Sequence, residues 1–251
     1  MKSVGVIISL IFALNANAQG QLEYDVVVSE NGKAVCKAKN GKIGKNLFTD
    51  LKNFQEAYAA NHGTIHCADL TKLDLSGAEL QGGDLRAASL AGVDLSNALM
   101  AEISLAYSDM KKADLSGVDL ANADLVQVNL VSAKIIGASL NSVLLTKSNL
   151  SKADLSGANL EGANLTSAKL VGASLVSANL LGANLEGANL SDADLRGTSE
   201  QPLDLTGASV ENLLLKGAKF NDYSIFPWAG YDKSVSERKE INEGKGMVYS
   251  N

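Results

Sequence analysis

The chain has 251 residues with 28 acidic and 22 basic side chains, and its net charge of −6 disfavours binding to a nucleic-acid backbone. Two cysteines and two histidines are its only thiolate and imidazole ligands, and His62 and His66 in "HGTIHC" do not match a standard zinc spacing. We therefore expect no nucleic-acid partner, no bound metal and no cofactor.

Residues 1–18 have the pattern of a secretory signal peptide. Lys2 precedes an apolar run of eleven residues, Val4–Leu14, and small residues stand at Ala16 and Ala18. The run is shorter than the roughly 20 residues that a spanning helix needs. We expect cleavage before Gln19, no integral membrane segment in the mature chain, and an exported bacterial protein, periplasmic or secreted. The alternative is a buried N-terminal strand or helix.

Export suggests a role for Cys36 and Cys67. In an oxidising compartment two cysteines are most simply one disulfide. It would close a loop of about thirty residues and add roughly 3–4 kcal/mol in the chain-entropy model. A metal site that recruits His62 and His66 beside Cys67 is the weaker alternative.

An apolar residue recurs every five positions from residue 65 to residue 225. Of these 33 sites 25 are Leu, and Glu200 is the one site without an apolar side chain. Ala is frequent two positions before each site, Asp or Asn one position before, and Gly two positions after. A helix or a flat strand would spread such leucines over all of its faces. The period instead predicts a backbone that turns once per word, so that four words close a coil with Leu and Ala inside and Asn, Asp and Gly at the corners.

The words A-N-L-E-G, A-D-L-S-G and A-N-L-S-D resemble those of the pentapeptide-repeat family, and the likeness covers residues 64–225. The resemblance implies an all-β solenoid, a right-handed quadrilateral β-helix. Its 33 words would make about eight coils and a rod roughly 40 Å long. Such a rod needs capped ends.

Both ends of the repeat have sequences that suit caps. In the segment 19–63, two β-like runs flank Asn31-Gly32, and Leu47, Leu51, Phe54 and Tyr58 stand at helical spacing within residues 46–63. We predict a hairpin and a helix that Cys36–Cys67 fastens to the rod. Five aromatic residues cluster at the start of the segment 226–251 and just before it: Phe220, Tyr223, Phe226, Trp228 and Tyr231. We predict that they form a hydrophobic plug, and the alternative is a ligand site. Residues 234–245 are a candidate helix.

The stretch 197–202 is the one break in the repeat. Glu200 occupies an inward site there, and burying it unpaired would cost several kcal/mol. We expect this word to bulge outward and to replace one side of a coil. It is either a tolerated irregularity or a functional loop.

Residues 68–125 carry ten acidic and four basic side chains, whereas residues 126–195 are nearly neutral. The acidic half is either a solvated surface or a docking surface for a basic partner, with these candidates: Asp84, Asp94, Asp114, Asp119 and Asp124. Apolar residues also stand just after the inward Leu, where side chains should point outward. They make a second candidate partner surface: Val131, Ile136, Val171, Val176 and Leu181.

The acids follow the register of the repeat, and no His lies within the rod between residues 68 and 225, so no catalytic arrangement is predicted there. The leading hypothesis is a non-enzymatic exported module that binds or scaffolds an unidentified protein of the envelope. Two alternatives stay open. The family resemblance implies a DNA-mimicking protector of DNA gyrase, and the rod could instead be a spacer that presents its N-terminal cap. A homodimer through an end cap is also an option.

Overall fold

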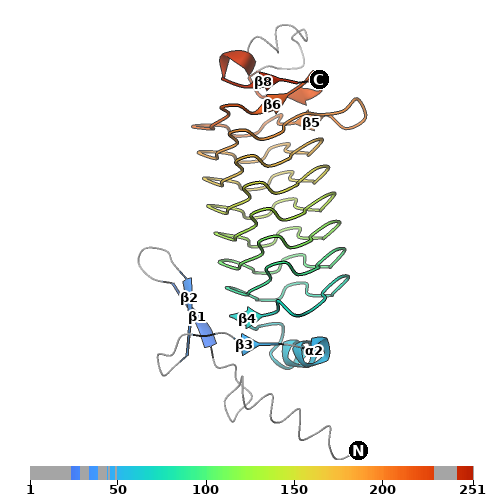
Figure 1. Cartoon of the computed structure of the whole chain (residues 1–251), viewed down its shortest axis with the longest axis vertical. Coiled ribbons are helices and arrows are strands. Elements are labelled where there is room, and N and C mark those ends of the chain that lie inside the picture. The colour runs from blue at the N-terminus through green and yellow to red at the C-terminus, as the bar shows by residue number, and fades with distance from the viewer. Residues whose placement is uncertain are drawn as a thin grey trace, which may run out of the picture.

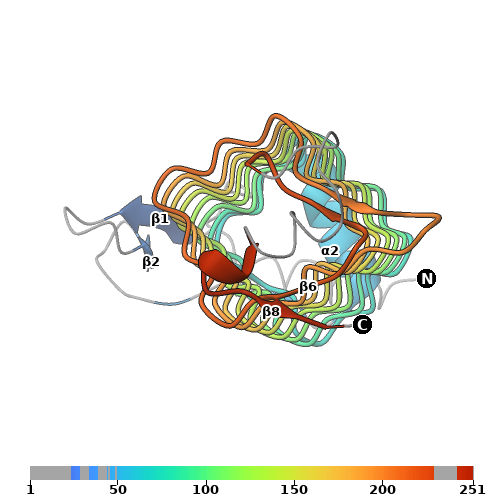
Figure 2. The same ribbon diagram turned by 90° about the horizontal axis from the view of Figure 1, so that it is seen from above.

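The computed structural model describes residues 24–28, 34–38, 44, 46–48, 50–228 and 242–250. Over most of this length the chain winds into stacked coils around a common axis and forms a rod (Figures 1 and 2). Residues twenty apart pair as parallel bridges, as in the series Lys134, Asp154 and Ser174. Three further bridged positions lie between Lys134 and Asp154, at Ser139, Leu144 and Asn149, so each coil has four sides.

Each corner of a coil is a tight turn that one word encodes. The amide of Ala158 donates to the carbonyl of Leu155 at 3.0 Å, and Gly157 between them has a φ of 67°. A positive φ at the third residue of such a turn favours Gly. The carboxylate of Asp154 accepts a hydrogen bond from the amide of Ser156 at 3.0 Å, which fixes the entry to the turn. The corner roles that the sequence predicted for Gly and for Asp or Asn are confirmed.

The bore of the rod holds one large and one small side chain per word. Leu155 and Ala158 are both fully buried, and the same two positions are buried in nearly every coil. Adjacent coils lie at strand spacing, so each coil encloses only a thin slice of the bore. Given the diameter of the coil, this slice has no room for a second large side chain at most words, and Leu therefore alternates with Ala.

The break at residues 197–202 is an insertion and not a replaced side. Asp194 pairs with Lys219 and Asn179 pairs with Asp204, so the bridge spacing here is 25 residues instead of twenty. Leu203 returns to the bore fully buried, whereas Glu200 is exposed. The outward course of the loop was predicted, but the coil keeps all four sides. The register survives because the insertion has the length of one word.

Among the described residues, three strands and one helix precede the first coils. Strands β1 (Tyr24–Val28) and β2 (Ala34–Ala38) form an antiparallel hairpin, as predicted. Strand β3 (Asn46–Leu47) pairs in parallel with β4 (Ala68–Asp69). Helix α2 (Leu51–Ala60) begins at its N-cap Asp50 and contributes Phe54 and Ala57 to the core. The predicted helix was too long at its start, because residues 46–47 pair with a coil; as a result Leu47 is 48% exposed.

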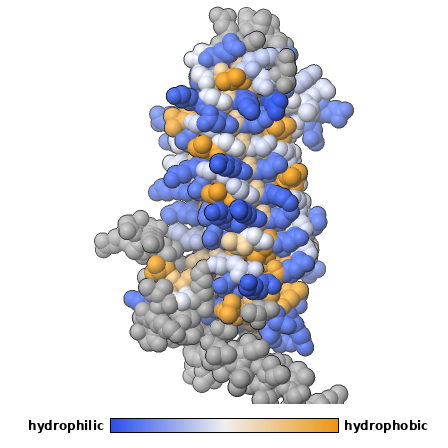
Figure 3. Space-filling view, in the orientation of Figure 1, coloured by the Kyte–Doolittle hydropathy of each residue, from blue (hydrophilic) through white to orange (hydrophobic). Residues whose placement is uncertain are grey.

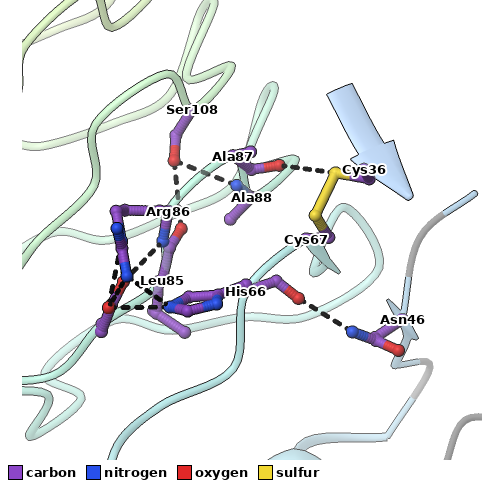
Figure 4. Close-up of a disulfide and its surroundings, with 10 residues drawn as sticks. Cys36, Asn46, His66, Cys67, Leu85, Arg86, Ala87, Ala88 and Ser108 are labelled. Atoms are coloured by element: carbon purple, nitrogen blue, oxygen red, sulfur yellow. Dashed lines mark hydrogen bonds and ion pairs between the residues drawn. A yellow bond between two sulfur atoms is a disulfide. The ribbon is translucent and has the colours of Figure 1, made fainter. Parts of the chain in front are cut away.

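The disulfide between Cys36 and Cys67 is present, with the Cα atoms 5.7 Å apart (Figure 4). It joins the hairpin to a corner of the first coils, where Cys36, Cys67 and Ala87 form a small buried cluster. This pairing confirms the prediction from the two cysteines.

At the other end, short parallel pairs continue the ladder. Strand β5 (Leu203–Asp204) pairs with β7 (Ser224–Ile225), and β6 (Lys219–Phe220) pairs with β8 (Val248–Tyr249). The rings of Phe220 and Phe226 are fully buried with centroids 6.5 Å apart, whereas Tyr223 of the same predicted cluster is 46% exposed.

Several predictions concern residues that lie mostly outside the described ranges. Residues 1–18, Tyr231 and most of the candidate helix 234–245 lie outside the described residues, and residues 242–244 make one helical turn. Within the described part of the chain, no helix has the length and apolar content that crossing a membrane requires.

The packing of the bore gives a first prediction. Replacing Leu155 by Ala should lower the free energy of unfolding by about 2–5 kcal/mol, because it leaves a cavity inside a coil. Replacing the exposed Glu161 by Ala should change it by less than about 0.5 kcal/mol. Urea unfolding followed by circular dichroism measures both, and equal midpoints for the two variants would contradict an inward Leu155.

Candidate functional surface

One edge of the rod gathers several departures from the repeat. The corner that contains Ile136 is hydrogen-bonded to the corner of Ser156, since the amide of Gly137 donates to the carbonyl of Ser156 at 2.9 Å. The same bond, also at 2.9 Å, links Gly157 to Val176 and Ser177 to Arg196. Ile136, Ser156, Val176 and Arg196 therefore form one column along the rod. We call this column, together with the loop 197–202 and Tyr223, the loop edge.

The loop has a fixed base. The side-chain amide of Asn221 clasps Gly197, accepting from its amide and donating to its carbonyl, both at 3.0 Å. Above it, the amide of Leu203 donates to the carbonyl of Tyr223 at 3.0 Å. Within the loop, Thr198 and Gln201 bond to each other at 2.9 and 3.0 Å. The loop thus projects from the rod on a braced base (Figure 2).

The surface of the loop edge is mixed. Ile136 is 44% exposed, Tyr223 is 46% exposed and Val176 is half-buried. The guanidinium of Arg196 contacts Asp194 at 2.6 Å. Burial raises the pKa of Asp194, but the hydrogen bonds from Arg196 outweigh it and lower that pKa. This pair is neutral overall and fixed to the rod, so Glu200 at the loop tip is the exposed charge of the edge.

The structure brings together some of the residues predicted as a site and separates the others. Asp94 and Asp114 are bridged to each other on the side of the coil that ends at the loop edge. The Ser116 hydroxyl and the Lys134 ammonium, 3.1 Å away, lower the pKa of Asp114. The other candidates stand on other sides or corners of the coil: Val131, Val171, Leu181, Asp84, Asp119 and Asp124. Val131 and Val171 share one corner column, and Ile136 and Val176 share the next one along the chain.

Asp84 belongs to a separate ionic cluster with His66 and Arg86, two residues that lie near the disulfide (Figure 4). Its carboxylate accepts from His66 Nε2 at 2.7 Å and from Arg86 Nε and Nη2 at 2.9 and 2.7 Å. Burial raises the pKa of this carboxyl, but the hydrogen bonds from His66 and Arg86 outweigh it and hold the pKa well below its usual range. His66 and Arg86 are twenty residues apart, on adjacent turns of one corner, so the cluster ties the first coils together.

Sequence reasoning missed three exposed leucines. Leu99, Leu144 and Leu214 are 41%, 43% and 54% exposed, and each precedes an inward residue at the position that usually holds Asp, Asn or Ser. The signal was the doublet of apolar residues, as in Leu144-Leu145. They lie on different sides of the rod. On the face drawn in Figure 3, apolar residues likewise stand scattered among hydrophilic ones.

The described residues hold no group of three or more His, Cys, Asp or Glu side chains that could bind a metal ion. The acids instead serve the fold, because the side-chain oxygens of Asp94, Asp119 and Asp124 each accept the amide two residues later at 2.9–3.1 Å.

A family model of pentapeptide repeats, eight copies long, matches residues 68–105, 84–122, 108–146, 123–162 and 158–197. These matches together extend from residue 68 to residue 197, more than half of the chain. The protein belongs to the pentapeptide-repeat family, and its rod is a right-handed quadrilateral β-helix. No curated protein sequence matches the chain.

Solved structures of the same family are similar to the chain. HetL, a pentapeptide repeat protein from the cyanobacterium Nostoc sp. strain PCC 7120, is 32% identical with a TM-score of 0.51, over 69% of this chain and 84% of HetL. HetL is involved in heterocyst differentiation regulation. QnrB1, a plasmid-mediated fluoroquinolone resistance protein, is 14% identical with a TM-score of 0.34, over 75% of this chain and 92% of QnrB1. A thylakoid-lumen protein of Arabidopsis thaliana is 30% identical with a TM-score of 0.21, over 45% and 62%.

The Asp84 cluster predicts a pH-dependent contribution to stability. Because the folded pKa of Asp84 is depressed, its contribution is present above the unfolded value of about 4 and is lost as the pH falls toward the folded value. At pH 7 Asp84→Asn should lower the free energy of unfolding by about 1–3 kcal/mol, and this difference from the parent protein should shrink below about pH 4.

Asp124→Asn is the matched control, because Asp124 lies on the same side of the rod and its Oδ1 accepts the amide of Val126 at 3.1 Å, a bond that an Asn side chain can also accept. Urea midpoints between pH 7 and pH 2 measure both variants. A difference for Asp84→Asn that stays constant over this range would contradict the ionic role of Asp84.

Proposed function

We propose that the protein is a non-enzymatic, exported module that binds a protein partner of the bacterial envelope along the loop edge. One observation carries the proposal: exposed apolar residues and the inserted loop, which the repeat does not require, meet on a single edge of the rod. Ile136 and Val176 align with the base of the loop, and Tyr223 lies directly above it.

The coil does not need the loop in order to close. Removing Thr198–Pro202 from the sequence would leave A-D-L-R-G followed by L-D-L-T-G, two uninterrupted words with the inward sites in register. The coil would then close with twenty residues, as its neighbours do. A segment that the fold can spare, yet whose base is held by the clasp of Asn221, is better explained by recognition than by stability.

The side chains of the loop edge also suggest which side chains its partner presents. Ile136, Val176 and Tyr223 can receive apolar side chains, which gain most when water leaves both surfaces. The exposed carboxylate of Glu200 can receive a basic side chain. We therefore propose a partner segment with apolar residues and a flanking Lys or Arg. The involvement of HetL in regulation of heterocyst differentiation is compatible with a binding role for this fold.

The proposal that no catalysis takes place rests on how the acids are used. Asp side chains of the rod are engaged by the amides of their own turns, and Asp84, Asp114 and Asp194 are paired with cations. A hydrolytic pair of carboxylates would need one acid held protonated near neutral pH. Four carboxyl groups in the described part of the chain instead have pKa values below their usual range: Asp74, Asp84, Asp114 and Asp194.

Export, the coil count and the caps complete the proposal. The signal-peptide pattern of residues 1–18 and the disulfide of Cys36 with Cys67 both fit an oxidising compartment. We propose about eight coils, with helix α2 closing the first coils and the aromatic residues closing the last ones. Both ends would then be protected from pairing with the edges of another rod.

The loop edge is tested by crosslinking in intact cells, followed by purification of the protein and quantitative mass spectrometry. Deletion of Thr198–Pro202, and separately Val176→Ser with Ile136→Ser, should each reduce the crosslinked partner at least about tenfold. Circular dichroism and thermal unfolding show that each variant keeps its fold.

Val171→Ser is the matched control, because Val171 is equally half-buried at another corner of the rod. Its crosslinked partner should be unchanged. Partner recovery that is the same for the loop deletion and the parent protein would overturn the assignment of the loop edge.

Export is tested by a separate measurement. The mature protein purified from cells should have the mass of a chain that begins at Gln19, and it should contain no free thiol before reduction. A full-length mass with Met1 retained, or two titratable thiols in the native protein, would contradict export.

A further inference from the structure

A cavity of about 230 Å³ opens at the C-terminal end of the rod. It is lined by Val210, Leu213, Leu215, Trp228 and Lys245. The three aliphatic residues belong to the last words of the repeat, whereas Trp228 and Lys245 come from the chain that follows. The cavity is thus the place where the bore of the rod ends.

The bore is incompletely filled here. Val210 and Leu213 stand at inward positions, one coil beyond Leu185 and Ala188, since Asn184 pairs with Ser209 and Asn189 with Leu214. Leu185 and Ala188 are fully buried, but Val210 and Leu213 remain partly exposed. Their apolar side chains face the cavity without the coil that would cover them elsewhere, so an apolar ligand that displaces water from them gains free energy.

The aromatic wall of the cavity is held in place from behind. The indole of Trp228 stacks on Phe226 with a centroid distance of 5.1 Å and an interplanar angle of 15°. Its Nε1 donates to Asn242 Oδ1 at 2.8 Å. The ammonium of Lys245 lies over the indole ring, 4.5 Å from its centroid.

Lys245 supplies one positive charge beside the apolar walls. Among the described residues it forms no ion pair, so its charge is not neutralised by a carboxylate of the rod. A cation beside an apolar cavity favours a ligand with an anionic head and an apolar body.

We propose that this end of the rod binds a small apolar carboxylate. The alkyl or aryl part would lie against Val210, Leu213 and Leu215, and the carboxylate would pair with the ammonium of Lys245. The volume is below the roughly 300–1,000 Å³ of sites for drug-sized ligands, which restricts the ligand to a short chain or a single ring. The site lies apart from the protein-binding role proposed above and does not depend on it.

The chain contains one tryptophan, so the fluorescence of Trp228 reports on this cavity alone. The full-length mature protein is titrated with octanoate and, for comparison, with 1-octanol, which has the same chain and no charge. Octanoate should produce a saturable change in the intensity or the emission maximum, with a dissociation constant at least about tenfold below that of 1-octanol.

Two variants locate the two parts of the ligand. Lys245→Met should weaken octanoate binding about tenfold and leave 1-octanol unchanged, because it removes the charge but keeps an apolar side chain. Val210→Phe should abolish binding of both probes by filling the cavity. Lys152→Met, a lysine in the middle of the rod, is the control and should bind octanoate like the parent protein.

Three results would overturn the proposal: no saturable response to octanoate, equal affinity for octanoate and 1-octanol, or an unchanged response in Lys245→Met. If Val210→Phe fails to fold, which thermal unfolding will show, the Lys245→Met titration still decides between these outcomes.

Discussion

The backbone pairing between residues twenty apart is the constraint on which the rest of the structure depends. The backbone amides of each coil donate both to the next coil and to the one before, as when Leu155 donates to Ser174 at 2.8 Å and Asp154 donates to Ala133 at 3.0 Å. A coil that gained or lost a single residue would shift every later bond and would turn Leu out of the bore. Irregularities are therefore tolerated only as whole words that leave the coil outward, and the loop 197–202 has this form.

The same constraint separates stability from recognition. The bore and the corners use the inward Leu, the small residue and the Asp or Asn of each word, so these positions carry little information about a partner. The outward position after each Leu is released from packing, and there Ser156, Glu161 and Val176 are equally compatible with the coil. Binding specificity can consequently be encoded at these positions without any change to the fold, and the loop edge is where several such choices coincide.

Much of this architecture could be predicted from the sequence, because a period of five with alternating Leu and Ala has few other solutions. The cysteine pair was also predictable, since Cys36 and Cys67 have no other thiol to pair with. Features made by contacts between distant words were harder to predict. Leu47 was assigned to a helix because its spacing to Leu51 suited one, but pairing with β4 decided its conformation. His66 and Arg86 were not connected to Asp84, although a spacing of twenty places them on one corner.

The two irregular features both lie in the last coils, and the energetics of a repeat array explain why. Each coil is stabilised mainly by its contacts with the coil before and the coil after, so a disturbance in the middle of the rod weakens two interfaces and divides the array. Near the end, fewer coils depend on the disturbed interface. The clasp of Asn221 on Gly197 and the stacking of Trp228 on Phe226 compensate locally for what the repeat no longer provides. The C-terminal end can therefore carry a loop and an open cavity without destabilising the regular coils from residue 65 to residue 195.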